Sequence, residues 1–135
     1  MTRPAARQGD QVTATDTHVV MVPSPPGGPV PTPLPHPFAG QLVERLEPTV
    51  LIGGRPAATV GSVARNVPPH LPTPPGTAFQ RPPSNRGTVR TGSTSVLLGG
   101  SGAARQGDPV VTCNDPSDLP AGTITTGDPT VVIGG

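Results

Sequence analysis

The sequence predicts an all-β domain built from three similar β-hairpins. In residues 48–58, an alternating run of β-branched and apolar residues meets Gly-Gly and continues into a second short extended segment. The pattern recurs in residues 94–104 and, split in two, in residues 130–135 and 3–6. A Gly-Gly pair supplies the positive φ angles of a two-residue hairpin turn. We therefore expect the last strand to pair with the first, closing three equivalent hairpins into a ring with approximate three-fold symmetry.

The composition allows only a thin hydrophobic core. The 135 residues include 22 Pro and 18 Gly, a proportion typical of disordered low-complexity chains. Trp and Tyr are absent, and Phe38 and Phe79 are the only large aromatic side chains. Because hydrophobic burial is then a weak source of stability for a chain of this length, we expect an additional stabilising cross-link, or staple.

The charged residues argue against nucleic-acid binding. The net charge is +1, and the nine basic residues, all Arg, are scattered singly without the interleaved aromatics of a phosphate-binding surface. No apolar run approaches the length of a transmembrane helix, and the N-terminus lacks the apolar centre of a secretory signal. Because Cys113 is the only cysteine, an internal disulfide is excluded.

The first half of the chain is predicted to contain turns, strands and a proline-rich segment. Residues 7–10 (Arg-Gln-Gly-Asp) predict a turn, and residues 105–108 repeat it, which favours a turn-forming role for the Asp over a catalytic one. Residues 13–22 alternate in polarity and predict a strand. The proline density of residues 23–37 favours polyproline II structure, and residues 38–46 predict another strand.

The second half repeats this organisation. Residues 59–62 occupy the place of the same turn in degraded form, and residues 71–92 form a second proline-rich excursion. Residues 110–113 extend the strand that returns from the second complete hairpin, and residues 121–127 lead back to the closing strand.

The histidines and the cysteine occupy related places in the repeat. Counted from the residue before each Ala-Ala pair, His18 and His70 both lie fourteen residues on, and Cys113 lies eleven residues on. Equal offsets in a repeat predict equivalent places in space, so these three side chains should meet near the axis, where His36 can supply a fourth ligand. Three imidazoles and one thiolate suit the tetrahedral preference of a closed structural zinc site.

Two other interpretations of these residues remain open. Histidines in proline-rich loops are commonly exposed, and a lone buried cysteine is often a small apolar filler. A hydrolase that uses Cys113 and a histidine is the second alternative, although the chain shows no strained nucleophile turn and no orienting partner.

The Ala-Ala segments resemble the repeats of the proline-alanine-alanine-arginine (PAAR) family. The resemblance covers essentially the whole chain, although Thr59 replaces the motif Arg in the second copy and Gly102 replaces the Pro in the third. The three copies, each associated with a strand of the Val-Leu-Ile-Gly-Gly type, are Pro4-Ala5-Ala6-Arg7, Pro56-Ala57-Ala58 and Gly102-Ala103-Ala104-Arg105.

The resemblance implies an all-β, pseudo-three-fold cone of short hairpins with Pro/Gly-rich loops, stabilised by zinc at its apex. The family binds zinc through three His and one Cys, which implies His18, His36, His70 and Cys113 as the ligands. It also implies a non-enzymatic spike tip of a contractile injection system, such as a type VI secretion system or a phage-tail-like particle, that helps the spike to pierce target membranes.

The same resemblance implies the partners. We expect one copy to cap a trimeric β-helical spike of the valine-glycine-repeat or phage-spike type, with transient contact to the target membrane and no nucleic-acid partner. The alternative is an adaptor that docks a separate effector through residues 23–37, and a catalytic toxin is more remote. Residues 1–135 are expected to form one spike-tip domain without a fused effector, cytoplasmic until assembly and then ejected with the spike.

Overall fold

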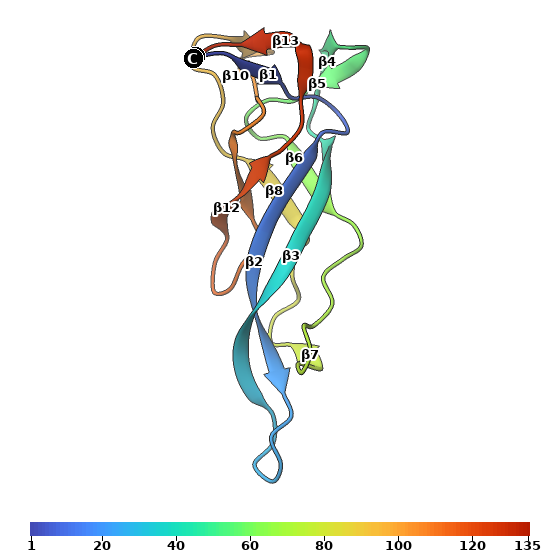
Figure 1. The fold of residues 1–135 in the computed structure, drawn as a ribbon, viewed down its shortest axis with the longest axis vertical. Coiled ribbons are helices and arrows are strands. Elements are labelled where there is room, and N and C mark those ends of the chain that lie inside the picture. Colours follow the sequence, from blue (N-terminus) through green and yellow to red (C-terminus); the bar gives the residue numbers. More distant parts are fainter.

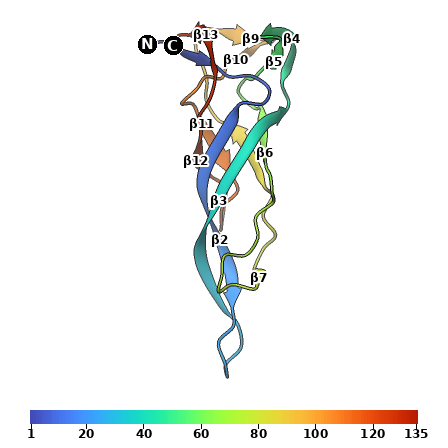
Figure 2. The ribbon, with the colours of Figure 1, turned by 45° about the vertical axis from the view of Figure 1, so that its right-hand side comes forward.

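Thirteen strands form a long cone in the computed structural model of the protein, which describes residues 1–135 (Figure 1). Both chain ends lie at the wide end, and the loop between the second and third strands forms the point (Figure 2). The strands are β1 (Arg3–Ala5), β2 (Gln11–Val22), β3 (Val30–Glu44), β4 (Glu47–Ile52), β5 (Arg55–Ala57), β6 (Val63–Asn66), β7 (Ala78–Phe79), β8 (Arg86–Val89), β9 (Leu97–Leu98), β10 (Ser101–Gly102), β11 (Pro109–Thr112), β12 (Leu119–Ile124) and β13 (Asp128–Ile133).

The all-β prediction is confirmed. Every regular element is a strand. The structure contains no helix that is long and apolar enough to cross a bilayer. The largest sheet runs in the order β12-β11-β8-β6-β3-β2, and β12 pairs again with β2, so these six strands close on themselves. Closure leaves β7 as a short addition to the distal part of β2.

Three two-stranded ribbons at the wide end confirm the predicted hairpins. They are β4–β5, β9–β10 and β13–β1, and the third is formed by the two ends of the chain (Figures 1 and 2). In the first turn, Gly53 and Gly54 have φ angles of 57° and 81°, and in the second Gly99 and Gly100 have φ angles of 59° and 86°. These left-handed conformations explain why glycine occupies both turn positions.

A ring of backbone hydrogen bonds joins the three ribbons at the axis. The amide of Ala6 donates to the carbonyl of Ala104 at 2.9 Å, Ala104 donates to Ala58 at 3.0 Å, and Ala58 donates to Ala6 at 3.0 Å. All three alanines are fully buried in one cluster. A larger side chain at any of them would have no room where three backbones converge, which gives the Ala-Ala pairs of the sequence a packing role.

The repeated turns are closed by side chains, as the sequence predicted. The Asp10 carboxylate accepts a hydrogen bond from the amide of Arg7 at 2.8 Å, and Asp108 accepts one from Arg105 at the same distance. In the degraded copy, the Ser62 hydroxyl accepts from the Thr59 amide at 2.9 Å. The three turns are therefore equivalent in structure although one has lost its acid.

The proline-rich segment differs from the prediction, because residues 30–37 belong to strand β3 rather than to a polyproline II segment. The register places Pro31, Pro33, Pro35 and Pro37 opposite odd-numbered residues of β2. Those β2 residues turn their backbone polar groups away from β3: the Val19 amide, for example, donates to Asp115 at 2.8 Å.

The alternation of an antiparallel pair makes this arrangement possible. Only every second residue of β3 needs an N–H toward β2, and the prolines occupy the other positions, which face an edge without a partner strand. A proline-lined edge offers no N–H donors to a foreign strand, so it also resists edge-to-edge association.

The terminal ribbon provides a first test of the fold. Removing residues 131–135 should abolish cooperative folding, because it takes away the partner of β1 and the buried Ile133, whose burial alone is worth about 2–3 kcal/mol. A short Gly-Ser extension after Gly135 is the control and should leave the melting temperature unchanged. A truncated chain with the native melting curve would contradict ring closure.

The proline alternation provides a second test, by thermal unfolding of two neighbouring variants. Thr32→Pro should destabilise the protein by about 3 kcal/mol, because Thr32 pairs with the buried Val20 at a position that needs its N–H. Pro33→Thr adds a donor on the open edge and should cost about 1 kcal/mol or less. Equal effects of the two changes would show that the register has no such alternation.

Candidate metal centre

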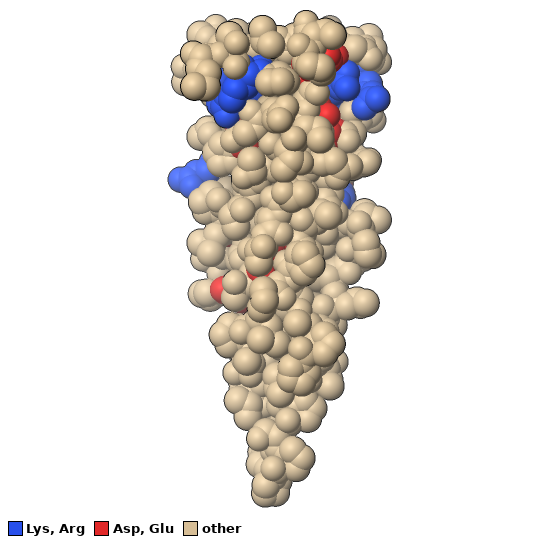
Figure 3. Space-filling view, viewed as in Figure 1, with Lys and Arg blue, Asp and Glu red and all other residues tan.

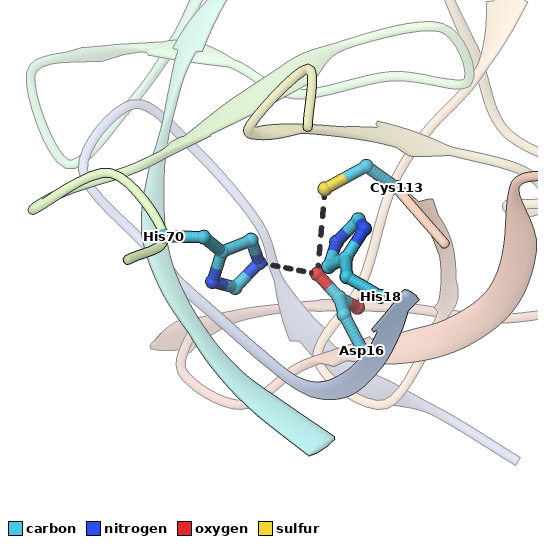
Figure 4. A group of neighbouring side chains, drawn as sticks. All are labelled: Asp16, His18, His70 and Cys113. Carbon is cyan, nitrogen blue, oxygen red and sulfur yellow. Dashed lines mark hydrogen bonds and ion pairs between the residues drawn. The ribbon is translucent and has the colours of Figure 1, made fainter. Parts of the chain in front are cut away.

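Four buried side chains meet inside the cone: Asp16, His18, His70 and Cys113 (Figure 4). Their candidate ligand atoms all lie within 4.8 Å of one another. Asp16 and His18 lie on β2, His70 lies between β6 and β7, and Cys113 follows β11 directly. The structure therefore brings together three of the four residues that the sequence predicted as ligands, from three different arms of the repeat.

Strand alternation explains why the residues of β2 and β3 face inward. Val12, Asp16, His18 and Val20 are buried at even positions of β2. His36 is likewise buried on the inner face of β3, directly opposite Asp16 in the strand pairing. The inward face of β2 is thus apolar at Val12, polar at Asp16 and His18, and apolar again at Val20.

His18 is the residue with the clearest need for a partner. Both of its ring nitrogens are buried and make no hydrogen bond. Burial lowers the pKa of His18 below its usual range, although the Asp115 carboxylate, 3.5 Å from Nδ1, acts in the opposite direction. A neutral imidazole with buried, unpartnered nitrogens is suited to bind a metal ion.

His70 is held by Asp16. Its Nε2 atom lies 2.9 Å from Asp16 Oδ2, and the hydroxyl of Thr112 donates to Asp16 Oδ1 at 2.6 Å. Asp16 is fully buried and makes no ion pair with an arginine, so a bound cation would compensate its charge. The sequence analysis missed Asp16, although its place two residues before His18 on a strand is the signal that could have revealed it.

His36 lies beside this group rather than within it. Its ring centroid is 5.4 Å from that of His18 and 5.6 Å from that of His70. Its Nδ1 atom lies 2.8 Å from the carbonyl of Leu34, and its Nε2 atom accepts a hydrogen bond from the Thr73 amide at 3.1 Å. To bind a metal, Nε2 would have to release that amide, so a ligand role for His36 stays a prediction.

The Cys113 thiol is protonated at neutral pH when no metal is bound. Burial, assisted by the nearby Asp16, raises the pKa of Cys113 to about 11. Catalytic cysteines have the opposite property, a lowered pKa, so this environment does not favour Cys113 as a nucleophile. A metal ion would instead displace the thiol proton.

The donors fit a metal ion of the zinc type. Imidazole nitrogen and thiolate sulfur are preferred zinc ligands, and Zn–N distances of about 2.0–2.1 Å require the imidazoles that bind one zinc to lie close together. The centroids of His18 and His70 are 5.0 Å apart, and His36 completes a triangle with similar sides. The group could therefore bind a metal ion, with either His36 or Asp16 as the fourth residue.

A clamp closes one side of this centre. Arg81 donates to Asp115 Oδ1 at 3.1 and 2.7 Å and to the carbonyl of Asn114 at 2.8 Å. Burial acts to raise the pKa of Asp115, but the hydrogen bonds from the Val19 amide and Arg81 outweigh it and lower this pKa. A cavity of about 250 Å³ lies beside the clamp and reaches His18 and Cys113.

Comparison with known proteins finds one matching family model. The family model described as the PAAR motif matches residues 80–135, which contain β8 to β13 and Cys113. Neither a curated protein nor a solved structure matches the chain. Over residues 80–135 the match confirms the resemblance that the sequence predicted, and this part of the chain carries a PAAR motif.

Proposed function

We propose that the protein is a structural tip that caps and sharpens the trimeric β-helical spike of a contractile injection system, either a type VI secretion system or a phage-tail-like particle. The observation that carries the proposal is the cone itself, whose wide end presents three equivalent hairpins (Figure 1). The PAAR motif in residues 80–135 supports it, because the resemblance to that family implies a structural, non-enzymatic tip.

The wide end offers three similar apolar contacts. Leu51, Leu97 and Val132 occupy equivalent positions in β4, β9 and β13, and they are 62%, 61% and 56% exposed. Exposed apolar side chains related by three-fold symmetry suit the end of a trimeric partner. One copy per spike trimer follows, because a single chain supplies all three contacts.

The opposite end suits passage through a membrane. No charged residue occurs between Asp16 and Glu44, and the distal part of the visible surface carries none (Figure 3). Moving charges or unpaired N–H donors into an apolar layer is costly. The point carries no charged side chain, and the prolines along the edge of β3 leave that edge without unpaired N–H donors. These features support a role in piercing the target membrane.

A zinc ion at His18, His36, His70 and Cys113 would stiffen this narrow end. When bound, zinc supplies a rigid cross-link that can contribute on the order of 10 kcal/mol to folding. Such a link joins β2, β3, the segment before β7 and the end of β11 where the apolar core has ended. In this proposal the protein is cytoplasmic until it is assembled at the tip of the injection particle, and it is then ejected with the spike.

The adaptor alternative is favoured by one feature of the flank. Val67 and Leu71 are 73% and 78% exposed, and they line a pocket of about 350 Å³ beside β3. An apolar patch away from the wide end could receive an effector while the spike is bound. The two functions are compatible, since they use different surfaces.

Metal content tests the proposed staple. Purified protein should contain about one zinc per chain, and Cys113→Ser, His70→Ala and His36→Ala should each lower zinc occupancy and melting temperature. Ser24→Ala, in the loop at the point, is the control. Acid should also release the ion, because zinc needs a thiolate and neutral imidazoles. A protein that contains no metal and keeps its melting temperature in chelator would refute the staple.

Docking to the spike tests the cap. Leu51→Glu and Leu97→Glu should each weaken binding to the spike trimer by about tenfold or more, because each places a charge in an apolar contact. Leu71→Glu, an equally exposed leucine on the flank, should bind normally. Native mass spectrometry should find one copy per trimer. Three copies, or no complex at micromolar concentrations, would overturn the cap and favour the adaptor.

A further inference from the structure

Each of the three histidines near the centre has an oxygen atom beside one of its ring nitrogens. His70 Nε2 faces Asp16 at 2.9 Å, His36 Nδ1 faces the Leu34 carbonyl at 2.8 Å, and His18 Nδ1 faces Asp115 at 3.5 Å. In metal centres, such an oxygen accepts the N–H of the ligand imidazole, fixes its tautomer and strengthens its binding to the ion. The Asp115 contact has no role in the function proposed above.

Asp115 is held in place independently of His18. The Val19 amide donates to Oδ2 at 2.8 Å, and Arg81 donates to Oδ1. The Asp115 amide in turn donates to the carbonyl of Thr17 at 2.8 Å. Its side chain is only 6% exposed, so the carboxylate is fixed between β2 and Arg81 before any ligand arrives.

His18 is the complementary group. Both of its nitrogens lack a hydrogen bond, which leaves one for a metal ion and one for a carboxylate. Because Nδ1 is the nitrogen that faces Asp115, Nε2 is the one left for the ion. We propose that Asp115, clamped by Arg81, is a positioning residue that accepts the Nδ1–H of His18 and so directs Nε2 to the bound metal. This inference rests on the proposed metal centre.

A matched pair of variants tests it. Asp115→Asn keeps an oxygen for the Val19 amide but removes the charge that His18 faces, and it should lower zinc affinity by about 10- to 100-fold in competition with a chromogenic chelator. Asp118→Asn removes the same charge from an exposed residue of the same cavity. It should change zinc affinity by about twofold or less, because solvent screens it.

Two further readouts separate positioning from a structural role. The visible spectrum of the cobalt-substituted protein should be the same in wild type and Asp115→Asn, because the four ligands are unchanged. The nitrogen NMR signals of zinc-loaded wild type should show a protonated Nδ1 in His18, and Asp115→Asn should shift that signal. Asp115→Asn should lower the melting temperature in chelator, because it removes the ion pair with Arg81, and this loss of stability by itself would not move the Nδ1 signal of His18.

The clamp supplies a variant for the case in which Asp115→Asn does not fold. Arg81→Gln keeps the Asp115 carboxylate but removes the ion pair that holds it, so this variant should lower zinc affinity several-fold. The control is Arg86→Gln, which removes an ion pair with Glu44 and should leave zinc affinity unchanged. Equal zinc affinities in wild type, Asp115→Asn and Arg81→Gln, or equal losses in Asp115→Asn and Asp118→Asn, would overturn the inference. A wild-type protein that binds no metal would instead refute the proposed centre.

Discussion

The cyclic hydrogen bonds between Ala6, Ala58 and Ala104 are the constraint on which the rest of the structure depends. Each arm contributes one donor and one acceptor at the axis, so no arm can be satisfied without the other two. Because only a methyl group fits at each corner, the three backbones approach closely, and the ribbons above and the closed sheet below take their positions from this ring. The wide end is therefore symmetric by necessity, whereas the loops that leave it are free to differ.

Below the ring, polar contacts replace apolar packing as the cone narrows. Phe38 and Leu42 are the largest buried side chains of the apolar part, and beyond them histidines, Asp16 and Cys113 share the interior with Val20 and Phe79. A narrow cone has too little volume for a second apolar layer, so directional bonds and a metal-binding group are the more economical means of fixing the strands. The narrow part also has no strand to cover the open edge of β3, and prolines along that edge leave it without unpaired N–H donors.

The repeat allowed much of the fold to be predicted from sequence. Gly-Gly pairs and β-branched runs are local signals, so the hairpins, the closure of the terminal strands and the turn role of Asp10 and Asp108 are all confirmed by the structure. The equal offsets of His18 and His70, with Cys113 at a related place in the third copy, also predicted correctly that these three side chains converge.

The remaining features depend on register, which the sequence does not display. Proline density predicts polyproline II structure unless the pairing partner is known, and only the pairing with β2 shows that every proline of β3 falls where no N–H is needed. Asp16 was missed for a similar reason. Its importance comes from the cross-strand and inter-arm neighbours that surround it, Thr112 and His70, which are distant in the chain.

The long β2–β3 hairpin has a mechanical consequence. Its strands run along the cone, toward the point, while the hydrogen bonds between them run across it (Figure 1). A thrust delivered through the wide end therefore acts parallel to the strands, and sliding one past the other requires the bonds from Gln11 to Val22 to break together rather than one after another. Because bending a ribbon requires its strands to slide past each other, this ladder of hydrogen bonds stiffens the molecule where it is thinnest.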